Sequence, residues 1–212
     1  MTLQDVIDQL AGSELSNVFT FDDDAQRIGV ESVGKLIPQL NLGLQLLHNR
    51  FFLKEGTEII NMQEGVWTYS LTNPDVLRIE AVKDLNDNEY LLDVVGDPES
   101  LIRKNLTTLK VPKDMEPVTL EVTYRAGPTK LIAMDRYEIP SDVAVDLPDA
   151  FMEPLVLFIG SRFLNPMGAS EGMHEGNNYA AKYEQACRLL ENQNYDLDRT
   201  DNTHSFETAG WV

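Results

Sequence analysis

The chain contains little cysteine and few basic residues, and it lacks a long apolar segment. With a single cysteine, Cys187, it has no pair for an intramolecular disulfide and no cysteine-rich zinc site. The first ten residues, MTLQDVIDQL, include two aspartates and no basic cluster, which is not the pattern of a signal peptide. No run approaches the roughly 18 apolar residues of a membrane span. We therefore expect a soluble protein that is made in the cytoplasm.

The shortage of basic residues gives the chain a strongly negative charge. Its 17 Lys and Arg residues face 35 Asp and Glu residues, and the formal net charge is −18. A surface this acidic repels phosphate backbones, which argues against a nucleic-acid-binding protein. One interpretation of the charge is solubility alone. The other is a protein that lies close to DNA without holding it, such as the wall of a conduit.

Known catalytic and metal-binding patterns are also missing. The histidines, His48, His174 and His204, are far apart and have no partner at the spacing of a metal motif. Cys187 falls on the apolar face of a predicted helix, which favours a buried, inert thiol. Asp22–Asp24 lack the spaced ligands and the glycine of a calcium loop, so a solvated turn is favoured. We expect no cofactor, no metal and no enzymatic activity.

Helical periodicity marks both ends of the sequence. A first helix is predicted between Thr2, a plausible N-cap, and Gly12, which is placed to end it. A loop, Phe19–Asp24, follows it. A second, narrower apolar seam predicts a helix that Pro38 either kinks or begins. The apolar positions are Leu3, Val6, Ile7 and Leu10 in the first helix, and Val30, Val33, Ile37, Leu40, Leu44 and Leu47 in the second.

Two further helices are predicted after residue 145. Asp146 and Pro148 form a capped first turn, and the connection Asn165–Gly176 separates this helix from a last one that ends near Asn192. The apolar faces are Phe151, Met152, Leu155, Val156, Ile159 and Phe163 in the third helix, and Tyr179, Tyr183, Ala186, Cys187 and Leu190 in the fourth.

The middle of the chain, from 51 to 145, is rich in β-branched and aromatic residues separated by turn formers. Val118–Tyr124 alternates between apolar and polar residues, which is typical of a half-buried strand, and Ala126-Gly127-Pro128 ends it. The other predicted strands are Thr57–Met62, Val66–Leu71, Val76–Val82 and Tyr90–Val95. An antiparallel meander or a small barrel would accommodate these strands.

These elements predict an α+β fold. We expect one domain, 1–193, in which an antiparallel helical bundle (1–50 and 146–193) carries the β-rich insertion 51–145. The polar remainder, 194–212, is an extended C-terminal tail that ends on Trp211 and Val212. A Trp at the tip suits a tether with an anchor, because its large ring fills pockets in partner proteins. The alternative is a tail that folds back on its own domain or frays.

Several stretches, in this order, resemble the head-to-tail adaptor (connector or neck) proteins of tailed bacteriophages. They are KLIPQLNLGLQLLHNRFFLKEGTEIINMQEG (35–65), VTLEVTYRAG (118–127), the approach 139–148 with the helix AFMEPLVLFIGSRFLNPMG (150–168), and GNNYAAKYEQACRLLE (176–191). Each is a packing pattern and not a catalytic signature. Together they cover most of residues 30–193, and their order carries the resemblance.

The resemblance implies a structural virion protein in the neck of the particle. Copies would form a ring, a dodecamer, under the portal protein, extend the DNA channel used in genome ejection, and bind the tail or nozzle protein. DNA would pass without specific binding. Phe206, Trp211 and Val212 would dock on the portal, and the β-rich unit would face the tail or a neighbouring copy. Alternatives are a tail terminator or tail-tube component, an unrelated acidic protein-binding module, or an enzyme with an unrecognised carboxylate site.

Overall fold

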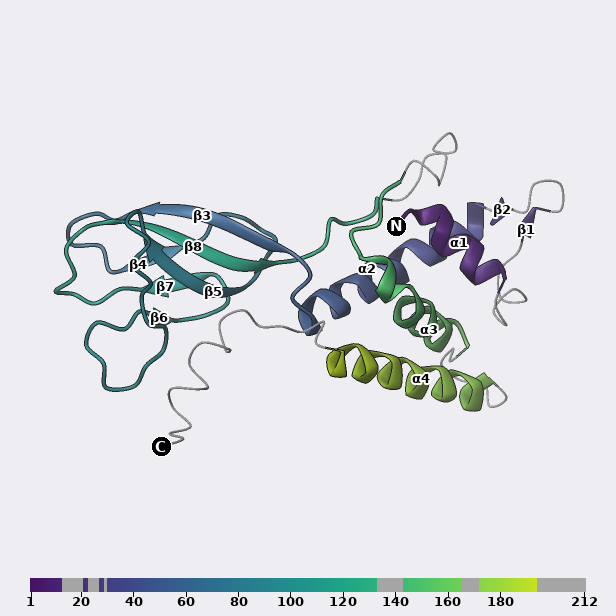
Figure 1. Ribbon diagram of the computed structural model, residues 1–212. Coiled ribbons are helices and arrows are strands. Elements are labelled where there is room, and N and C mark those ends of the chain that lie inside the picture. Colours follow the sequence, from purple (N-terminus) through teal and green to yellow (C-terminus); the bar gives the residue numbers. More distant parts are fainter. Residues whose placement is uncertain (13–20, 23–26, 29, 133–142, 165–171, 194–212) are drawn as a thin grey trace, which may run out of the picture. The chain divides into compact units, whose positions relative to one another are not determined.

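The computed structural model of the chain describes residues 1–12, 21–22, 27–28, 30–132, 143–164 and 172–193 (Figure 1). Both helices and antiparallel sheets are present, which confirms the predicted α+β class. Contacts along the chain separate two compact units. Of the described residues, the helical unit contains 1–51 and 128–193, and the β-rich unit contains 52–127.

The helical unit begins with α1, Leu3–Ala11, whose ends are as predicted. Thr2 and Asp5 form a capping box, in which Thr2 Oγ1 accepts from the Asp5 backbone N–H at 3.2 Å and the Asp5 carboxylate accepts from the Thr2 N–H at 2.7 Å. These hydrogen bonds hold the pKa of Asp5 below its ordinary value. At the other end, the Gly12 N–H donates to the Asp8 carbonyl at 2.9 Å. The predicted apolar face of the helix is buried.

The second helix, α2, spans Val30–Arg50 and continues through Pro38. The alternative in which a helix begins near this proline is therefore wrong. Pro38 is exposed, and its missing N–H removes one hydrogen bond of the helix. The predicted seam is buried over its described length, at Ile37, Leu40, Leu44 and Leu47. Two short paired strands precede α2, β1 (Phe21–Asp22) and β2 (Arg27–Ile28), so part of the predicted loop Phe19–Asp24 is strand.

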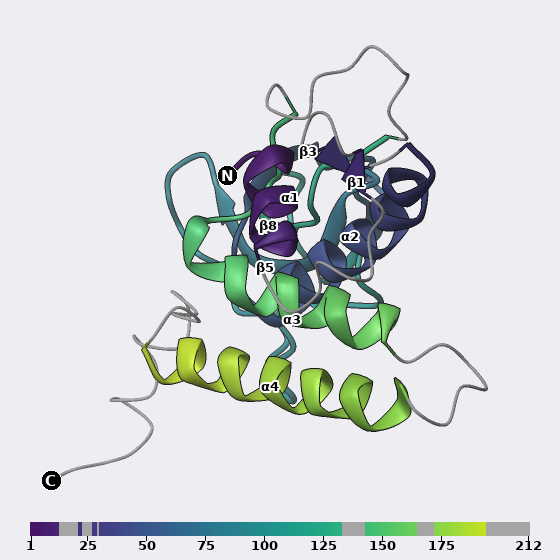
Figure 2. The ribbon, with the colours of Figure 1, turned by 90° about the vertical axis from the view of Figure 1, so that its right-hand side faces the viewer.

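The third helix, α3 (Met152–Phe163), contacts α1, α2 and α4 (Gly172–Asn192) and so forms the centre of the helical unit (Figure 2). A 3-10 turn, η3 (Asp149–Phe151), leads into it, with Pro148 as the N-cap and no side-chain capping hydrogen bond. The predicted cap by Asp146 is wrong, because its carboxylate accepts from the N–H and hydroxyl of Thr129. The helix α4 begins within the predicted connection Asn165–Gly176.

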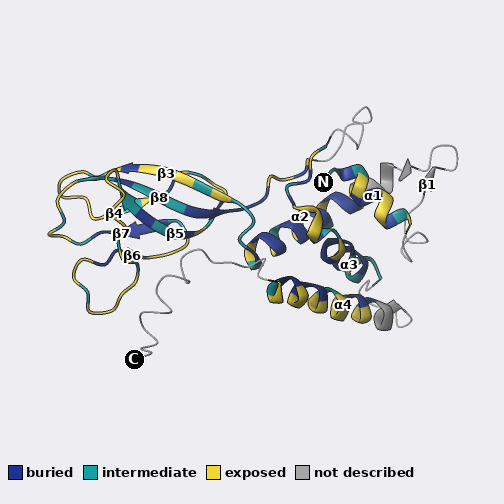
Figure 3. Ribbon diagram, in the orientation of Figure 1, coloured by how far each residue is buried: buried dark blue, intermediate teal, exposed yellow. Residues whose placement is uncertain are grey.

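The β-rich unit contains a sheet of three long antiparallel strands, β3 (Glu55–Asn61), β5 (Val76–Asp84) and β8 (Thr119–Ala126). Their order is β3-β8-β5, so the last strand of the unit lies between the other two. This order rules out the predicted meander, in which chain neighbours pair. The burial of the strands follows from this order: the central strand β8 is mostly buried, while the edge strand β3 is largely exposed (Figure 3).

A second antiparallel sheet has the order β4-β7-β6 and is formed by Thr68–Ser70, Thr108–Lys110 and Ile102–Arg103. Apolar residues of both sheets, and of the segments between them, form one buried cluster. Its members are Ile60, Leu71, Val76, Ile79, Val82, Leu101, Leu109, Val111, Leu120, Val122, Tyr124 and Ala126. The predicted strand Tyr90–Val95 is wrong, because this segment makes only an isolated bridge, Leu92 to Leu101.

No helix in the described part of the chain is both long enough and apolar enough to cross a membrane.

Candidate interaction site

The segment from Asp84 to Ile102 connects β5 to β6 and carries an exposed loop of the β-rich unit. It begins with a tight turn, in which the Asp84 carboxylate accepts from the backbone N–H groups of Asn86 and Asn88 at 2.7 and 2.9 Å. The Asn88 side chain donates to the same carboxylate at 2.8 Å. Hydrogen bonds from Asn88, and secondarily from Asn86, hold the pKa of Asp84 below its ordinary value. The turn is therefore fixed by one ionised side chain.

After this turn the segment covers the outer edge of β5. The Tyr90 N–H donates to the Val82 carbonyl at 2.9 Å, and the Arg103 guanidinium donates to the Ile79 carbonyl at 2.8 Å. An uncovered edge strand presents unpaired backbone groups to other chains, so these bonds protect β5 from edge pairing. They also attach the segment to the most buried part of the sheet, since Ile79 and Val82 are fully buried.

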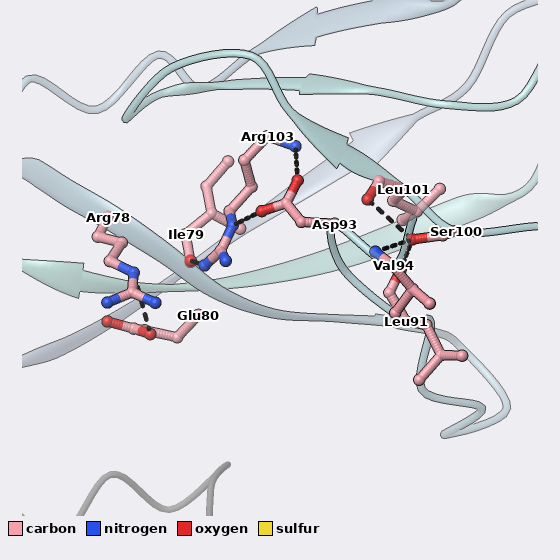
Figure 4. A network of polar contacts seen from close by, with 9 residues as sticks. All are labelled: Arg78, Ile79, Glu80, Leu91, Asp93, Val94, Ser100, Leu101 and Arg103. Atoms are coloured by element: carbon pink, nitrogen blue, oxygen red, sulfur yellow. Dashed lines mark hydrogen bonds and ion pairs between the residues drawn. The ribbon is translucent and has the colours of Figure 1, made fainter. Parts of the chain in front are cut away.

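An ion pair between Asp93 and Arg103 sets the path of the chain at the far end of this segment (Figure 4). Arg103 Nε and its backbone N–H donate to the two carboxylate oxygens of Asp93, at 2.6 and 2.8 Å. Burial alone would raise the pKa of Asp93, but the hydrogen bonds and charge of Arg103 lower it on balance. Asp93 has φ +55°, a left-handed conformation that Asp tolerates better than most residues. The chain therefore turns sharply at this residue.

Ser100 closes the loop that follows. Its hydroxyl accepts from the Val94 N–H at 2.9 Å and lies 3.2 Å from the Leu91 carbonyl, to which it donates (Figure 4). Gly96, at φ +90°, provides a second left-handed position that side chains rarely adopt. Residues 93–100, which we call the Val94–Val95 loop, are therefore held by side-chain hydrogen bonds at both ends.

This loop presents aliphatic side chains to solvent. Val95 is 100% exposed and Val94 is 44% exposed, with Leu91 at 46% beside them. Single exposed aliphatic residues are common on protein surfaces, but here two adjacent valines occupy the tip of an ordered loop. Because the loop is already fixed, a partner that covers these valines would lose little conformational entropy on binding. The arrangement is suited to protein–protein contact.

A second exposed patch lies at the start of β4, and we call it the Trp67–Lys113 patch. Trp67 is 41% exposed, Val66 lies next to it, and Lys113 Nζ lies 5.5 Å from the centre of the indole ring. The Trp67 carbonyl accepts from the Val111 N–H at 3.1 Å, which holds the main chain at Trp67 against β7. A Trp with a neighbouring cation is typical of residues that dominate binding energy at interfaces.

Charged residues of the helical unit have a structural role. Arg50, at the end of α2, binds Glu184 and Glu191 of α4 with N–O distances of 2.9 and 2.7 Å. The hydrogen bond to Glu191 is the main cause that raises the pKa of Arg50, and it lowers the pKa of Glu191. Cys187 is fully buried on the same helix, and burial raises the pKa of its thiol. A thiol of this kind is a poor nucleophile.

Of the histidines and the aspartate run, the structure describes the side-chain surroundings of His48. His48 is buried, with Nε2 2.8 Å from the Asp146 carbonyl oxygen. His174 belongs to α4, Asp22 belongs to β1, and His204 lies outside the described residues, as do Asp23 and Asp24. Within those residues, no group of three His, Cys, Asp or Glu side chains could hold a metal ion.

The predicted portal-docking residues, Phe206, Trp211 and Val212, lie outside the described residues. Sequence reasoning missed the Val94–Val95 loop, because the aliphatic run that contains it predicts a strand over Tyr90–Val95. The signal that could have identified it is Gly96-Asp97-Pro98, a turn-forming triplet directly after the two valines.

Comparison with models of known protein families finds none that matches this chain, and comparison with curated proteins finds no match.

Proposed function

We propose that the chain is a structural, non-enzymatic virion protein, a head-to-tail adaptor that forms a ring under the portal of a tailed bacteriophage. The observation that carries the proposal is the Val94–Val95 loop, an ordered loop with a fully exposed aliphatic tip. Such a loop is suited to binding another protein and contributes no reactive group. The sequence resemblance over most of residues 30–193 supports the adaptor among proteins that assemble.

In this proposal the helical bundle carries the β-rich unit as an insertion, and the tail 194–212 reaches the portal. Phe206, Trp211 and Val212 would supply the apolar contacts of that docking. The β-rich unit would face the tail or nozzle protein, or a neighbouring copy. The protein would be located in the neck of the virion, as a dodecamer.

The negative charge also supports the adaptor. A ring of copies that each carry a formal charge of −18 would repel the packaged DNA, so the genome could slide through the channel. Lysine-rich walls would instead bind phosphates and release counterions, which would hold the DNA in place.

Native mass spectrometry of the protein, alone and mixed with the portal protein of the same genome, tests the proposal. We expect a ring complex with the portal. We expect no complex for a variant that ends at residue 193, and weaker binding for Trp211→Ala. Leu189→Ala, which removes an exposed leucine of α4, is the matched control and should bind like the original chain.

A full-length protein that ignores the portal in every mixture contradicts the adaptor function. A ring that forms without the portal, and then binds a tail-tube protein in preference to it, would instead favour the tail terminator or tail-tube alternative.

A further inference from the structure

We infer that the outer edge of β3 binds an extended, basic segment of another protein, which adds to the sheet as an antiparallel strand. The inference goes beyond the proposed function and does not depend on it, because the proposed portal contacts belong to residues 194–212. Its evidence is the hydrogen-bond pattern of the sheet, the exposure of β3 and the charges around this strand.

One edge of β3 is paired and the other is open. Within the described residues, β3 pairs with β8 and with no other strand. Two bonds fix which residues face β8: the Ala126 N–H donates to the Lys54 carbonyl at 2.8 Å, and the Met62 N–H donates to the Val118 carbonyl at 3.1 Å. Bonded and non-bonded residues alternate along an antiparallel ladder, so the even-numbered residues of β3 bond to β8. The backbone groups that point to the outer edge are those of Glu55, Thr57, Ile59 and Asn61.

The two edges of this sheet differ in their protection. At the opposite edge, β5 is covered by the segment that follows Asp84, and its pairing with β8 contains register shifts. The sequence of β3, EGTEIIN, contains neither proline nor lysine, and this strand pairs with β8 without a shift. Its outward residues are exposed, with Ile59 at 51%. A regular, exposed edge of this kind is a template for a further strand.

The charges around β3 favour a basic partner. The strand contains Glu55 and Glu58 and no cation, and Lys54, which precedes it, offsets part of their charge. Arg125 lies opposite Glu55 on β8, but it is buried in its ion pair with Glu80. A second copy would bring the same carboxylates, on a chain of formal charge −18, against this edge. The charges that repel a second copy attract a basic segment of a different protein.

The pleat of the sheet indicates where the partner should carry its cations. Residues that pair with Glu55 and Ile59 would place their side chains on the same face as these two. On that face Glu121 of β8, opposite Ile59, adds a carboxylate, and the lysine beyond it, Lys83 of β5, is bound to Asp87. A partner lysine can lay its aliphatic stem on Ile59 while its ammonium group turns toward Glu121. The partner should therefore carry Lys or Arg at alternate positions.

NMR titration of the full-length chain with short, end-capped peptides in which lysine and valine alternate tests the inference. One peptide carries methyl groups on its valine nitrogens, and a second carries them on its lysine nitrogens. When the lysines pair with Glu55, Thr57 and Ile59, their N–H groups donate to β3 and the valine nitrogens point away. We expect the valine-methylated peptide to bind and to shift the amide signals of Thr57 and Ile59. The lysine-methylated peptide, of the same composition, should bind more weakly by on the order of tenfold or more.

Two further comparisons test the charge and the edge itself. A valine-methylated peptide with glutamate in place of lysine should not bind. Thr57→Pro removes an outward N–H and leaves the bonds to β8 in place, so it should weaken binding by on the order of tenfold. Thr57→Val retains the N–H and is the matched control, which should bind like the original chain. Unchanged amide signals of β5 verify that both variants are folded.

Three outcomes overturn the inference. Equal binding of the two methylated lysine peptides, or shifts confined to residues outside β3, would show that the contact is not strand addition. Failure of both lysine peptides to bind would show that the edge does not accept a basic segment. Sedimentation equilibrium of the chain alone tests the remaining occupant, since self-association that Thr57→Pro abolishes and Thr57→Val retains would assign the edge to a second copy.

Discussion

At the scale of single residues, the ion pair Arg125–Glu80 is the place where one substitution should cost the most stability, because both charges are buried in the β-rich unit. Arg125 Nε is 3.1 Å from Glu80 Oε1, and each side chain is less than 10% exposed. The pair links the central strand β8 to β5, and the Arg125 guanidinium also lies over the Phe52 ring at 5.2 Å. Burial makes each charge dependent on the other.

We therefore expect Arg125→Met to lower the free energy of unfolding by about 3–5 kcal/mol, because Glu80 would remain buried without its main cation. Urea unfolding followed by circular dichroism measures the change. The double variant Glu80→Leu/Arg125→Met removes both charges and should regain much of the loss. A loss below about 1 kcal/mol for the single variant, the range of exposed pairs, would mean that the pair is solvated.

Asp93 gives a pH dependence at the same scale. Its folded pKa is lower than its unfolded pKa, so its stabilisation of the Val94–Val95 loop is complete above the ordinary pKa of Asp, about 4. The stabilisation is lost as the pH falls through the lower, folded pKa. Hydrogen-exchange protection of the Val94 N–H, corrected for intrinsic rates, should stay constant from neutral pH to about pH 5 and decrease at lower pH.

Asp93→Asn is the control for this pH dependence. Asn also tolerates a positive φ, so the turn is retained while the charge is lost. We expect protection in this variant to be lower at neutral pH and to vary little on acidification. An Asn variant with the same acid-dependent loss as the original chain would assign that loss to another carboxylate.

At the scale of secondary-structure elements, the N-terminus of α1 depends on one hydroxyl. Thr2→Ala removes the acceptor for the Asp5 N–H, and it should destabilise the helical unit by about 1 kcal/mol. Thermal unfolding monitored by circular dichroism tests this expectation. Gln9→Ala, at an exposed position of the same helix, should change stability by less than about 0.5 kcal/mol. Equal effects of the two substitutions would show that the cap contributes nothing measurable.

Elements governed by local interactions were predicted well from the sequence. The helix α1 was predicted with both of its ends, because its cap and its apolar spacing lie within ten residues. The strands β3, β5 and β8 were also located, but their order was not. Pairing of β3 with β8 joins residues about sixty positions apart, such as Ile60 and Leu120, and no local pattern encodes it. The failures at Tyr90–Val95 and Asp146 have the same origin, since Arg103 and Thr129 fix their conformations from a distance.

The candidate site was the least predictable part. The sequence directed attention to a terminal Trp, whereas the structure presents two exposed valines beside an ion pair between residues ten positions apart in the sequence. A valine in an apolar run is ordinarily read as a core residue. In the structure both valines lie between two residues with positive φ, Asp93 and Gly96.

At the scale of the whole molecule, the β-rich unit has a core of its own. The buried cluster that unites its two sheets consists entirely of residues between Ile60 and Ala126. We therefore expect residues 52–127, produced alone, to fold and to unfold cooperatively in urea. Dispersed amide signals in an NMR spectrum provide a second measure. A collapsed spectrum would show that this unit requires the rest of the chain.

The two ends of the β-rich unit are hydrogen-bonded to each other, and at the outermost bond the Ala126 N–H donates to the Lys54 carbonyl at 2.8 Å. The chain leaves the helical unit after residue 51 and returns to it at residue 128. Because the two ends of the β-rich unit are adjacent, they are as close together as the ends of a short turn. Closing a flexible loop of this length would cost roughly 3 kcal/mol more than closing one of a few residues. Folding of the β-rich unit supplies that closure in advance. The folded β-rich unit thus shortens the effective loop between α2 and the chain after residue 127. A substitution that unfolds its sheet should therefore also lower the free energy of unfolding of the helical unit.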